Sequence, residues 1–249
     1  MKAAKQRLDV QLVERGLAQS RQRAQALILA GKVLVDGEKI TKAGSQVSVD
    51  CDIEIIGRDI PYVSRGGVKL EEALRDFNID VTGLTCLDVG ASTGGFTDCL
   101  LKHGAKHVTA VDVGYGQFDW ALRSDPRVKV IERTNIKHLD QGALSSLMDL
   151  VCIDVSFISL KIVVPVILKF LPPPGHLICL IKPQFEVGKG MVGKGGVVRD
   201  PALHEAVIKD LTEAFHGLNL RILGVIPSPI LGPKGNQEFL MHLQRIQGG

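Results

Sequence analysis

The chain has 249 residues, of which 45% are hydrophobic and 23% charged, with a formal net charge of +3. This composition is typical of an ordinary soluble globular chain, and the length suits one mid-sized domain and a small one. The N-terminal residues lack the apolar core of a signal peptide. The most apolar stretch, residues 162–181, is interrupted by Pro165, Lys169 and prolines 172–174, which excludes a membrane span there.

The charges are unevenly distributed along the chain. Residues 1–49 hold nine Lys or Arg and four Asp or Glu, a net charge of +5, whereas the other 200 residues sum to −2. A basic first part indicates a polyanion as its partner. The five cysteines have no CxxC spacing, and three of them lie in apolar runs, at Cys86, Cys152 and Cys179. We predict buried free thiols in a reducing cytosol.

The first part of the chain is predicted to form two helices and two or more strands. A short amphipathic helix runs from Arg7 to a glycine stop at Gly16, and Ser20 caps a second helix over 21–30. Short strands follow over 32–40, around an Asp-Gly turn, and over 47–56. A unit of this size is too small to be an enzyme.

The order of residues in this unit resembles the S-four-like RNA-binding domain, which is named for a ribosomal protein. The residues that carry the resemblance include Arg7, Leu8, Asp9, Gly16, Ser20, Arg21, Gly31, Lys32, Val33 and Gly37. It implies that five cations face structured RNA, namely Arg7, Arg21, Arg23, Lys32 and Lys42. The alternative is that these charged side chains only form a solvent-exposed helix face. We predict an RNA-binding domain over 1–56, a linker over 57–62 and a second domain over 63–249.

The rest of the chain alternates strands with helices. A helix is predicted from Ser64 to Phe77, and further helices over 96–103, 141–147, 159–170 and 201–216. Strands are predicted over 84–89, 107–112, 127–135, 148–154, 176–182, 220–226 and 237–243. This alternation predicts the α/β class, with a doubly wound, Rossmann-like sheet beside the small α+β domain.

A glycine turn follows the first of these strands, in Asp88-Val-Gly-Ala-Ser-Thr-Gly-Gly-Phe96. A strand, a glycine turn and a helix start form a nucleotide-type site. Ser92 occupies the position where a dinucleotide-binding turn needs its second glycine, which counts against NAD. Polar residues follow the other strands, at Asp112, Asn135, Asp154 and Lys182. Ligands of such sheets bind at these carboxyl ends, and Asp112 has the spacing of a ribose-binding acid.

The turn is similar to the first motif of S-adenosylmethionine-dependent methyltransferases. The resemblance implies that the loop holds the methionine part of this cofactor, that Asp112 takes the ribose hydroxyls and that Asn135 lies near the adenine. It gives the predicted cofactor residues as Asp88, Gly90, Ala91, Ser92, Gly94, Gly95, Phe96, Asp112, Asn135 and Asp154.

A second glycine-rich segment, residues 188–195, has the spacing of a phosphate-binding P-loop. It carries Gly195 where that loop needs Ser or Thr, and it starts six residues after the preceding strand ends. The alternative is a flexible lid that orders over bound RNA through Lys189, Lys194 and Arg199.

Four further residues form a set that resembles the Lys-Asp-Lys-Glu tetrad of FtsJ-like ribose 2′-O-methyltransferases: Lys69, Asp154, Lys182 and Glu238. Singly, each could be an ordinary surface or capping residue. The N-P-P-Y-like tetrapeptide of base N-methyltransferases is replaced by Asp-Val-Ser-Phe at 154–157. The sulfonium methyl group of the cofactor is already electrophilic, so that no metal is needed. The ribose hydroxyl is a poor nucleophile and needs orientation and proton removal. Our hypothesis makes Lys182 the base or orienting group, positioned by Asp154.

Taken end to end, the chain resembles the TlyA family, hemolysin-named ribosomal RNA 2′-O-methyltransferases. The resemblance implies a cytoplasmic enzyme that acts on cytidine ribose in ribosomal RNA or ribosomal subunits, without membrane association or an obligate protein partner. Two alternatives stay open, a non-catalytic RNA-binding ribosome-assembly factor and the cytolysin that the family name suggests.

Overall fold

The computed structural model describes residues 4–18, 20–56, 60–144, 146–188 and 190–247. The chain packs into two compact units, Met1–Ile60 and Pro61–Gly249. The boundaries predicted from the sequence stay a prediction, and residues 57–59 of the predicted linker lie outside the described ranges.

The first unit combines two helices with two small antiparallel sheets. Its elements are β1 (Lys5–Arg7), α1 (Leu8–Glu14), α2 (Arg21–Leu29), β2 (Val33–Val35), β3 (Glu38–Ile40), β4 (Gln46–Ser48) and β5 (Ile53–Ile55). Strand β1 pairs with β4, and β2 pairs with both β3 and β5. Asp36 and Gly37 have φ of 50° and 81°, as a tight two-residue turn between β2 and β3 requires.

The single strand predicted over 47–56 is wrong. The chain turns after Ser48, whose carbonyl accepts from the backbone N–H of Cys51, so the segment divides into β4 and β5 in two different sheets. Strand β1 was also not predicted, because three residues are too few for a period-two pattern.

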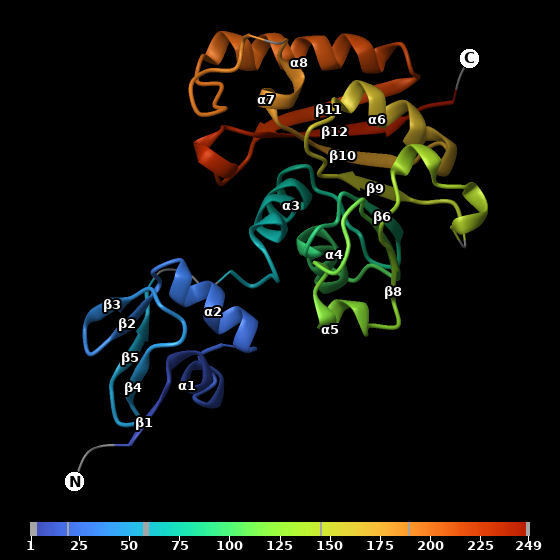
Figure 1. Cartoon of the computed structure of the whole chain (residues 1–249). Helices are drawn as coiled ribbons and strands as arrows, with labels where there is room; N and C mark the ends of the chain where they lie inside the picture. The colour runs from blue at the N-terminus through green and yellow to red at the C-terminus, as the bar shows by residue number, and fades with distance from the viewer. Residues whose placement is uncertain (1–3, 19, 57–59, 145, 189, 248–249) are drawn as a thin grey trace. The chain divides into compact units, whose positions relative to one another are not determined.

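The second unit contains a seven-stranded sheet (Figure 1). Its strands are β6 (Thr85–Val89), β7 (His107–Val111), β8 (Val128–Ile131), β9 (Leu150–Ile153), β10 (His176–Ile181), β11 (Leu220–Pro227) and β12 (Phe239–Arg245). Their order is β11-β12-β10-β9-β6-β7-β8. Strand β12 is antiparallel to both neighbours, and the other pairs are parallel, which confirms the doubly wound α/β prediction.

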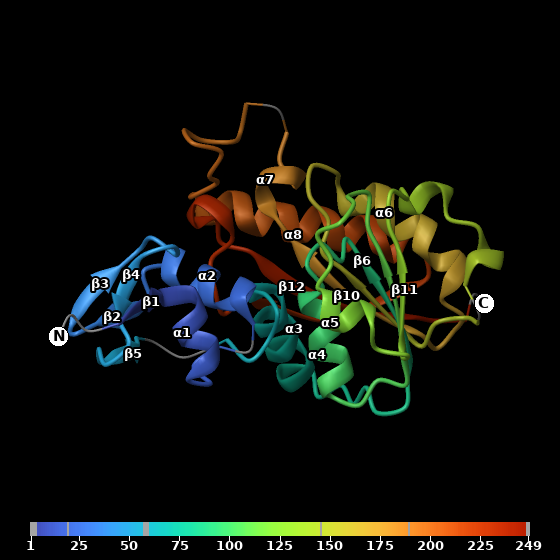
Figure 2. The same ribbon diagram turned by 60° about the horizontal axis from the view of Figure 1, so that its bottom comes forward.

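Helices cover both faces of this sheet. They are α3 (Arg65–Asp76), α4 (Gly95–Lys102), α5 (Trp120–Arg123), α6 (Leu160–Ile167), α7 (Pro183–Glu186) and α8 (Pro201–His216). Helices α3 and α4 pack together, as do α6 and α8. The two pairs lie on opposite faces in Figure 1, and the turned view in Figure 2 keeps this separation. Alternate side chains of β9 and β10 join those of α6 in one large buried apolar cluster.

Two other predicted elements differ from the structure. The helix over 141–147 is wrong, since the described residues there form only a 3-10 turn, Gln141–Ala143. Gly142 and the following serines disfavour a longer helix. The third strand ends at Ile131 rather than at Asn135, because Arg133 has a left-handed φ of 53° that leaves the extended conformation. The short helices α5 and α7 were not predicted.

The sheet order creates a switch point between β6 and β9. From β6 the chain continues to β7 and β8 on one side, and then returns to β9 and β10 on the other. Loops that leave the carboxyl ends of β6 and β9 therefore diverge, and the crevice between them is where such sheets bind ligands.

Candidate active site

The loop that joins β6 to α4 is shaped by close approaches to its neighbours. Gly90 and Gly94 have φ of 85° and 94°, and Ser92 also has a left-handed φ of 50°. A Cβ at Gly90 would collide with the carbonyl oxygen of Asp154, at the end of the adjacent strand β9. Only glycine allows the two strand ends to meet this closely.

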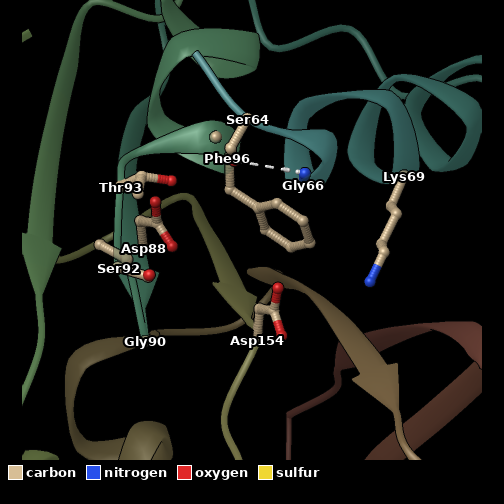
Figure 3. A pocket seen from close by; sticks show the side chains of 11 residues that line it. Ser64, Gly66, Lys69, Asp88, Gly90, Ser92, Thr93, Phe96 and Asp154 are labelled. Carbon is tan, nitrogen blue, oxygen red and sulfur yellow. Dashed lines mark hydrogen bonds between the residues drawn. The ribbon is translucent and has the colours of Figure 1, made fainter. Parts of the chain in front are cut away.

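A pocket opens beside this loop. It is lined by Ser64, Gly66, Lys69, Asp88, Gly90, Ala91, Ser92, Thr93, Gly95, Phe96 and Asp154. Figure 3 shows Lys69, from α3, and Asp154, from the end of β9, on either side of the space next to Phe96. The structure therefore brings most of the predicted cofactor residues into one cavity, together with two members of the predicted tetrad.

Asp88 is a fully buried acid on the wall of this pocket. Its Oδ2 accepts from the backbone N–H and the hydroxyl of Thr97, at 3.0 and 2.7 Å. Its Oδ1 has no hydrogen-bond partner among the described residues. Burial raises the pKa of this carboxyl to about 7, against the opposing hydrogen bonds from Thr97. An unsatisfied buried oxygen of this kind is costly unless a ligand completes it.

Asp112 is fixed by the loops around it. One carboxylate oxygen accepts from the backbone N–H of Ser92 at 2.8 Å, and the other accepts from that of Gly114 at 2.6 Å. Each oxygen keeps a second acceptor site. The hydrogen bond to Ser92 couples the end of β7 to the glycine loop, although Asp112 itself does not line the pocket.

Asn135 and Gly94 are the other predicted cofactor residues outside the pocket lining. Asn135 is exposed, and its side-chain oxygen accepts from the backbone N–H of Lys137 at 3.0 Å, which caps a 3-10 turn. Gly94 packs instead against Phe118 and Leu122, where a Cβ would lie within 3 Å of their side chains.

The predicted tetrad forms two ion pairs. Lys69 Nζ lies 2.5 Å from Glu238 Oε2, and Lys182 Nζ lies 2.6 Å from Asp154 Oδ1. Lys182 also donates to the Ser156 hydroxyl at 2.9 Å. Glu238 is fully buried and its other carboxylate oxygen, Oε1, has no hydrogen-bond partner among the described residues.

These pairs join elements that lie far apart in the sequence. Lys69 lies on α3, Asp154 and Lys182 directly follow β9 and β10, and Glu238 directly precedes β12. Because Lys69 and Asp154 line the same cavity, the two ion pairs converge on it. Burying such charges gains little stability, so their presence points to chemistry rather than to folding.

In the first unit, two of the predicted RNA-binding cations share one carboxylate. Asp9 is fully buried and accepts two hydrogen bonds from Arg7, both at 2.9 Å. It also accepts from Arg21 at 3.2 Å and from Gln25 at 2.8 Å. About half of each arginine side chain stays exposed. The cluster therefore orients two guanidinium groups at the surface.

The other predicted RNA-binding residues differ in exposure. Arg23 donates to the carbonyl of Ile60 at 3.0 Å, Lys32 is half-buried and Lys42 is exposed. In the second unit, Lys194 and Arg199 are exposed, whereas Lys189 lies outside the described residues.

The glycine-rich segment is not built as a P-loop. Helix α7 separates it from β10, and α8 begins only at Pro201. Figure 2 shows the described residues 190–195 on a loop that extends away from the sheet. Its end is held by buried Asn236, whose amide accepts from the backbone N–H of Val198 and donates to the carbonyl of Gly196, both at 3.0 Å.

Several residues of the site had no assigned role from the sequence. Ser64, Gly66 and Thr93 line the pocket. Ser64 could have been found from its position as a helix cap, which the structure confirms through its hydrogen bond from Gly66. Thr97 could not have been found from the sequence, because its contact with Asp88 depends on how the loop returns to the strand.

None of the helices in the described part of the chain is long and apolar enough to cross a membrane. The five cysteines are free and buried, as predicted for the three in apolar runs.

Comparison with known proteins gives a consistent result. Residues 62–245 match the FtsJ-like methyltransferase family, and residues 6–53 match the S4 domain. The chain is 47% identical to the 16S/23S rRNA (cytidine-2'-O)-methyltransferase TlyA of Mycobacterium tuberculosis, over 97% of this chain and 91% of that protein. It is 44% identical to Hemolysin A of Brachyspira hyodysenteriae, over 95% and 98% of the two chains.

A solved structure from Streptococcus thermophilus, described as a "putative hemolysin", is also similar. It shares 40% identity and a TM-score of 0.78, over 98% of this chain and 90% of that one.

Proposed function

Because the chain belongs to the FtsJ-like methyltransferase family and carries an S4 domain, we propose that it methylates a ribose 2′ hydroxyl of ribosomal RNA with S-adenosylmethionine. The observation that carries this proposal is the convergence of the two lysine–carboxylate pairs on the glycine-loop pocket. Base methylation is less well supported, because the loop after β9 carries Ser156 rather than a proline pair.

The pocket suits S-adenosylmethionine in two respects. The free acceptor on Asp88 is complementary to the ammonium of the methionine part, and the close approach at Gly90 leaves backbone rather than side chain beside the cofactor. Asp112 is held at the end of β7, where a carboxylate can accept from ribose hydroxyls. When bound, this cofactor supplies a methyl group on a cationic sulfur, which is electrophilic without a metal ion.

In the proposed reaction, Lys182 is the catalytic residue that orients the 2′ hydroxyl or takes its proton. Asp154 and Ser156 fix the direction of Nζ, so that this nitrogen can face the hydroxyl. Lys69, held by Glu238, contributes a positive charge to the cavity that Asp154 also lines. Holding the hydroxyl in line reduces the entropic part of the barrier.

The S4 domain and the names of relatives support the proposed substrate class. A basic unit with arginines at its surface suits RNA phosphates. The M. tuberculosis relative is named for cytidine in 16S and 23S rRNA. We therefore propose cytidine ribose in ribosomal RNA or assembled subunits as the target, and the cytoplasm as the place of action.

The test compares the wild type with Lys182→Ala. Calorimetric titration should show S-adenosylmethionine binding to both, whereas transfer of a labelled methyl group to ribosomal subunits should fall by about 10³-fold or more in the variant. A fully active variant would overturn the assignment of Lys182. Absence of cofactor binding to the wild type would instead favour an RNA-binding assembly factor, or the lytic role that the name Hemolysin A of a relative suggests.

A further inference from the structure

The two segments that carry the Asp154–Lys182 pair are joined along their length. One segment runs from Asp154 to Ser159, between β9 and α6, and the other is Lys182 with α7. At one end Lys182 contacts Asp154 and Ser156. In the middle the rings of Phe157 and Phe185 lie 4.9 Å apart between centroids.

At the far end, Glu186 binds the other segment with both carboxylate oxygens. Its Oε2 accepts from the Ser159 hydroxyl at 2.6 Å, and its Oε1 accepts from the backbone N–H of Leu160 at 2.8 Å. Leu160 is the first residue of α6, and Ser159 is its N-cap. Glu186 thus satisfies an N–H that the helix cannot pair, next to the positive end of the helix dipole.

Between these two attachments lies a strained backbone. Phe157 has φ of 65° although it is a bulky aromatic residue, and 90% of its surface is exposed. Such a conformation costs on the order of 1–3 kcal/mol and persists only where its surroundings hold it. Its exposed ring contributes little burial to offset this cost. Only four residues, 155–158, separate Asp154 from Ser159, so the attachments at the two ends hold the strained turn.

We propose that Glu186 is a positioning residue for methyl transfer. By holding Ser159 and the start of α6, it prevents the strained turn from relaxing, and so it keeps the Asp154 carboxylate beside Lys182. This inference rests on the proposed function of the Asp154–Lys182 pair. Glu186 itself does not line the pocket, so it acts through the segment and not on the substrate.

The chemistry of Glu186 agrees with this role. Burial raises its pKa, and the hydrogen bonds from Leu160 and Ser159 oppose that shift. Lys161 and Asp210 are the charged side chains that influence it, one of each sign. The half-buried Glu186 carboxylate is satisfied, because its two oxygens accept from two donors on the neighbouring segment.

The test measures kcat, KM and cofactor affinity for Glu186→Ala and Glu186→Gln in the full-length protein. We expect the alanine variant to lose about 10- to 100-fold in kcat, because small displacements of reacting groups have effects of this size. Its affinity for S-adenosylmethionine should change less than about threefold. Glutamine keeps an acceptor for Leu160 and should recover most of the lost kcat. Glu213→Ala, on an exposed part of α8, is the matched control.

A second measurement does not depend on activity. Hydrogen exchange at the Leu160 amide and across 155–158 should accelerate in Glu186→Ala and not in Glu213→Ala. Ser159→Ala, which removes one of the two donors, should give a smaller effect that is not additive with Glu186→Gln. Wild-type kcat in Glu186→Ala, or unchanged exchange at Leu160, would overturn the proposal. An inactive wild type would instead disprove the proposed function.

Discussion

The two units of the molecule each contain buried carboxylates, but these carboxylates differ in how many of their oxygens accept hydrogen bonds. Asp9 in the first unit accepts four hydrogen bonds from three side chains. Asp88 and Glu238 in the second unit each have one oxygen without a hydrogen-bond partner among the described residues. All three acids are fully buried.

The pKa values of Asp9 and Asp88 diverge accordingly. The hydrogen bonds from Arg7, the largest effect, lower the pKa of Asp9, whereas burial without a cation raises that of Asp88 to about 7. A carboxylate whose two oxygens are both hydrogen-bonded orients its neighbours. A carboxylate on a pocket wall with one free oxygen can accept a hydrogen bond from a ligand. This difference separates the proposed RNA-binding cluster from the proposed cofactor site.

The largest effect is expected for Lys69→Ala. It would leave the Glu238 carboxylate buried without a counter-charge, which destabilises a protein by about 3–5 kcal/mol. Chemical denaturation of the full chain, followed by a probe in the second unit, checks this. The double variant Lys69→Met/Glu238→Gln should recover most of the stability but no methyl transfer. Full activity in the double variant would contradict a catalytic role for this pair.

A somewhat smaller loss is expected for Asp9→Ala. Removing the acceptor should destabilise the first unit by roughly 2–3 kcal/mol, since the half-exposed Arg7 and Arg21 can still be hydrated. Affinity for ribosomal RNA should also fall, because both guanidinium groups lose their fixed orientation. Hydrogen exchange and filter binding at several salt concentrations measure the two effects. Glu54→Ala, an exposed acid on β5, is the control and should change neither.

Asp88→Asn should lower the affinity for S-adenosylmethionine about tenfold, or roughly 1.4 kcal/mol, at pH 8. In the wild type the affinity should fall below pH 7, as Asp88 takes up a proton, and the variant should lack this fall. The sign for folding is opposite: because the folded pKa lies above the ordinary value of 3.8, the stabilisation from Asp88 is present below about pH 4 and is lost as the pH rises towards 7.

Calorimetric titration between pH 5.5 and 8 tests the binding part of this prediction. Asp80→Asn is a suitable control, because Asp80 is exposed and its role as an acceptor for Thr82 survives in asparagine. The same pH dependence in the wild type and in Asp88→Asn would mean that another group controls cofactor affinity.

The smallest effect is expected for Asn135→Ala. This side chain is exposed and caps a 3-10 turn, so its loss should cost less than about 1 kcal/mol of stability and change cofactor affinity less than about threefold. Isothermal titration with S-adenosylmethionine measures the affinity. A decrease much larger than threefold would contradict this prediction and would support the contact with adenine that the family resemblance implies for Asn135.

Local signals in the sequence were reliable where the conformation depends on a few neighbouring residues. Ser20 and Ser64 cap the helices that follow them, and Asp36-Gly37 forms the predicted turn. The glycine loop after β6 also lies where the pattern of strand, turn and helix indicated. One failure was local as well: the helix predicted over 141–147 does not form, because Gly142 and the following serines disfavour it.

The sequence by itself therefore determined the doubly wound class, the position of the glycine loop and the identity of the four charged residues that carry the proposed chemistry. Only the tertiary structure decided how they pair. Lys69 and Glu238 are separated by 169 positions, and their contact depends on β12 entering the sheet beside β10. Likewise, Asp9 and Asp88 look alike in the sequence. Their opposite pKa shifts follow from folding, which places Arg7, Gln25 and Arg21 on Asp9 but buries Asp88 with hydrogen bonds from Thr97 alone among the described residues.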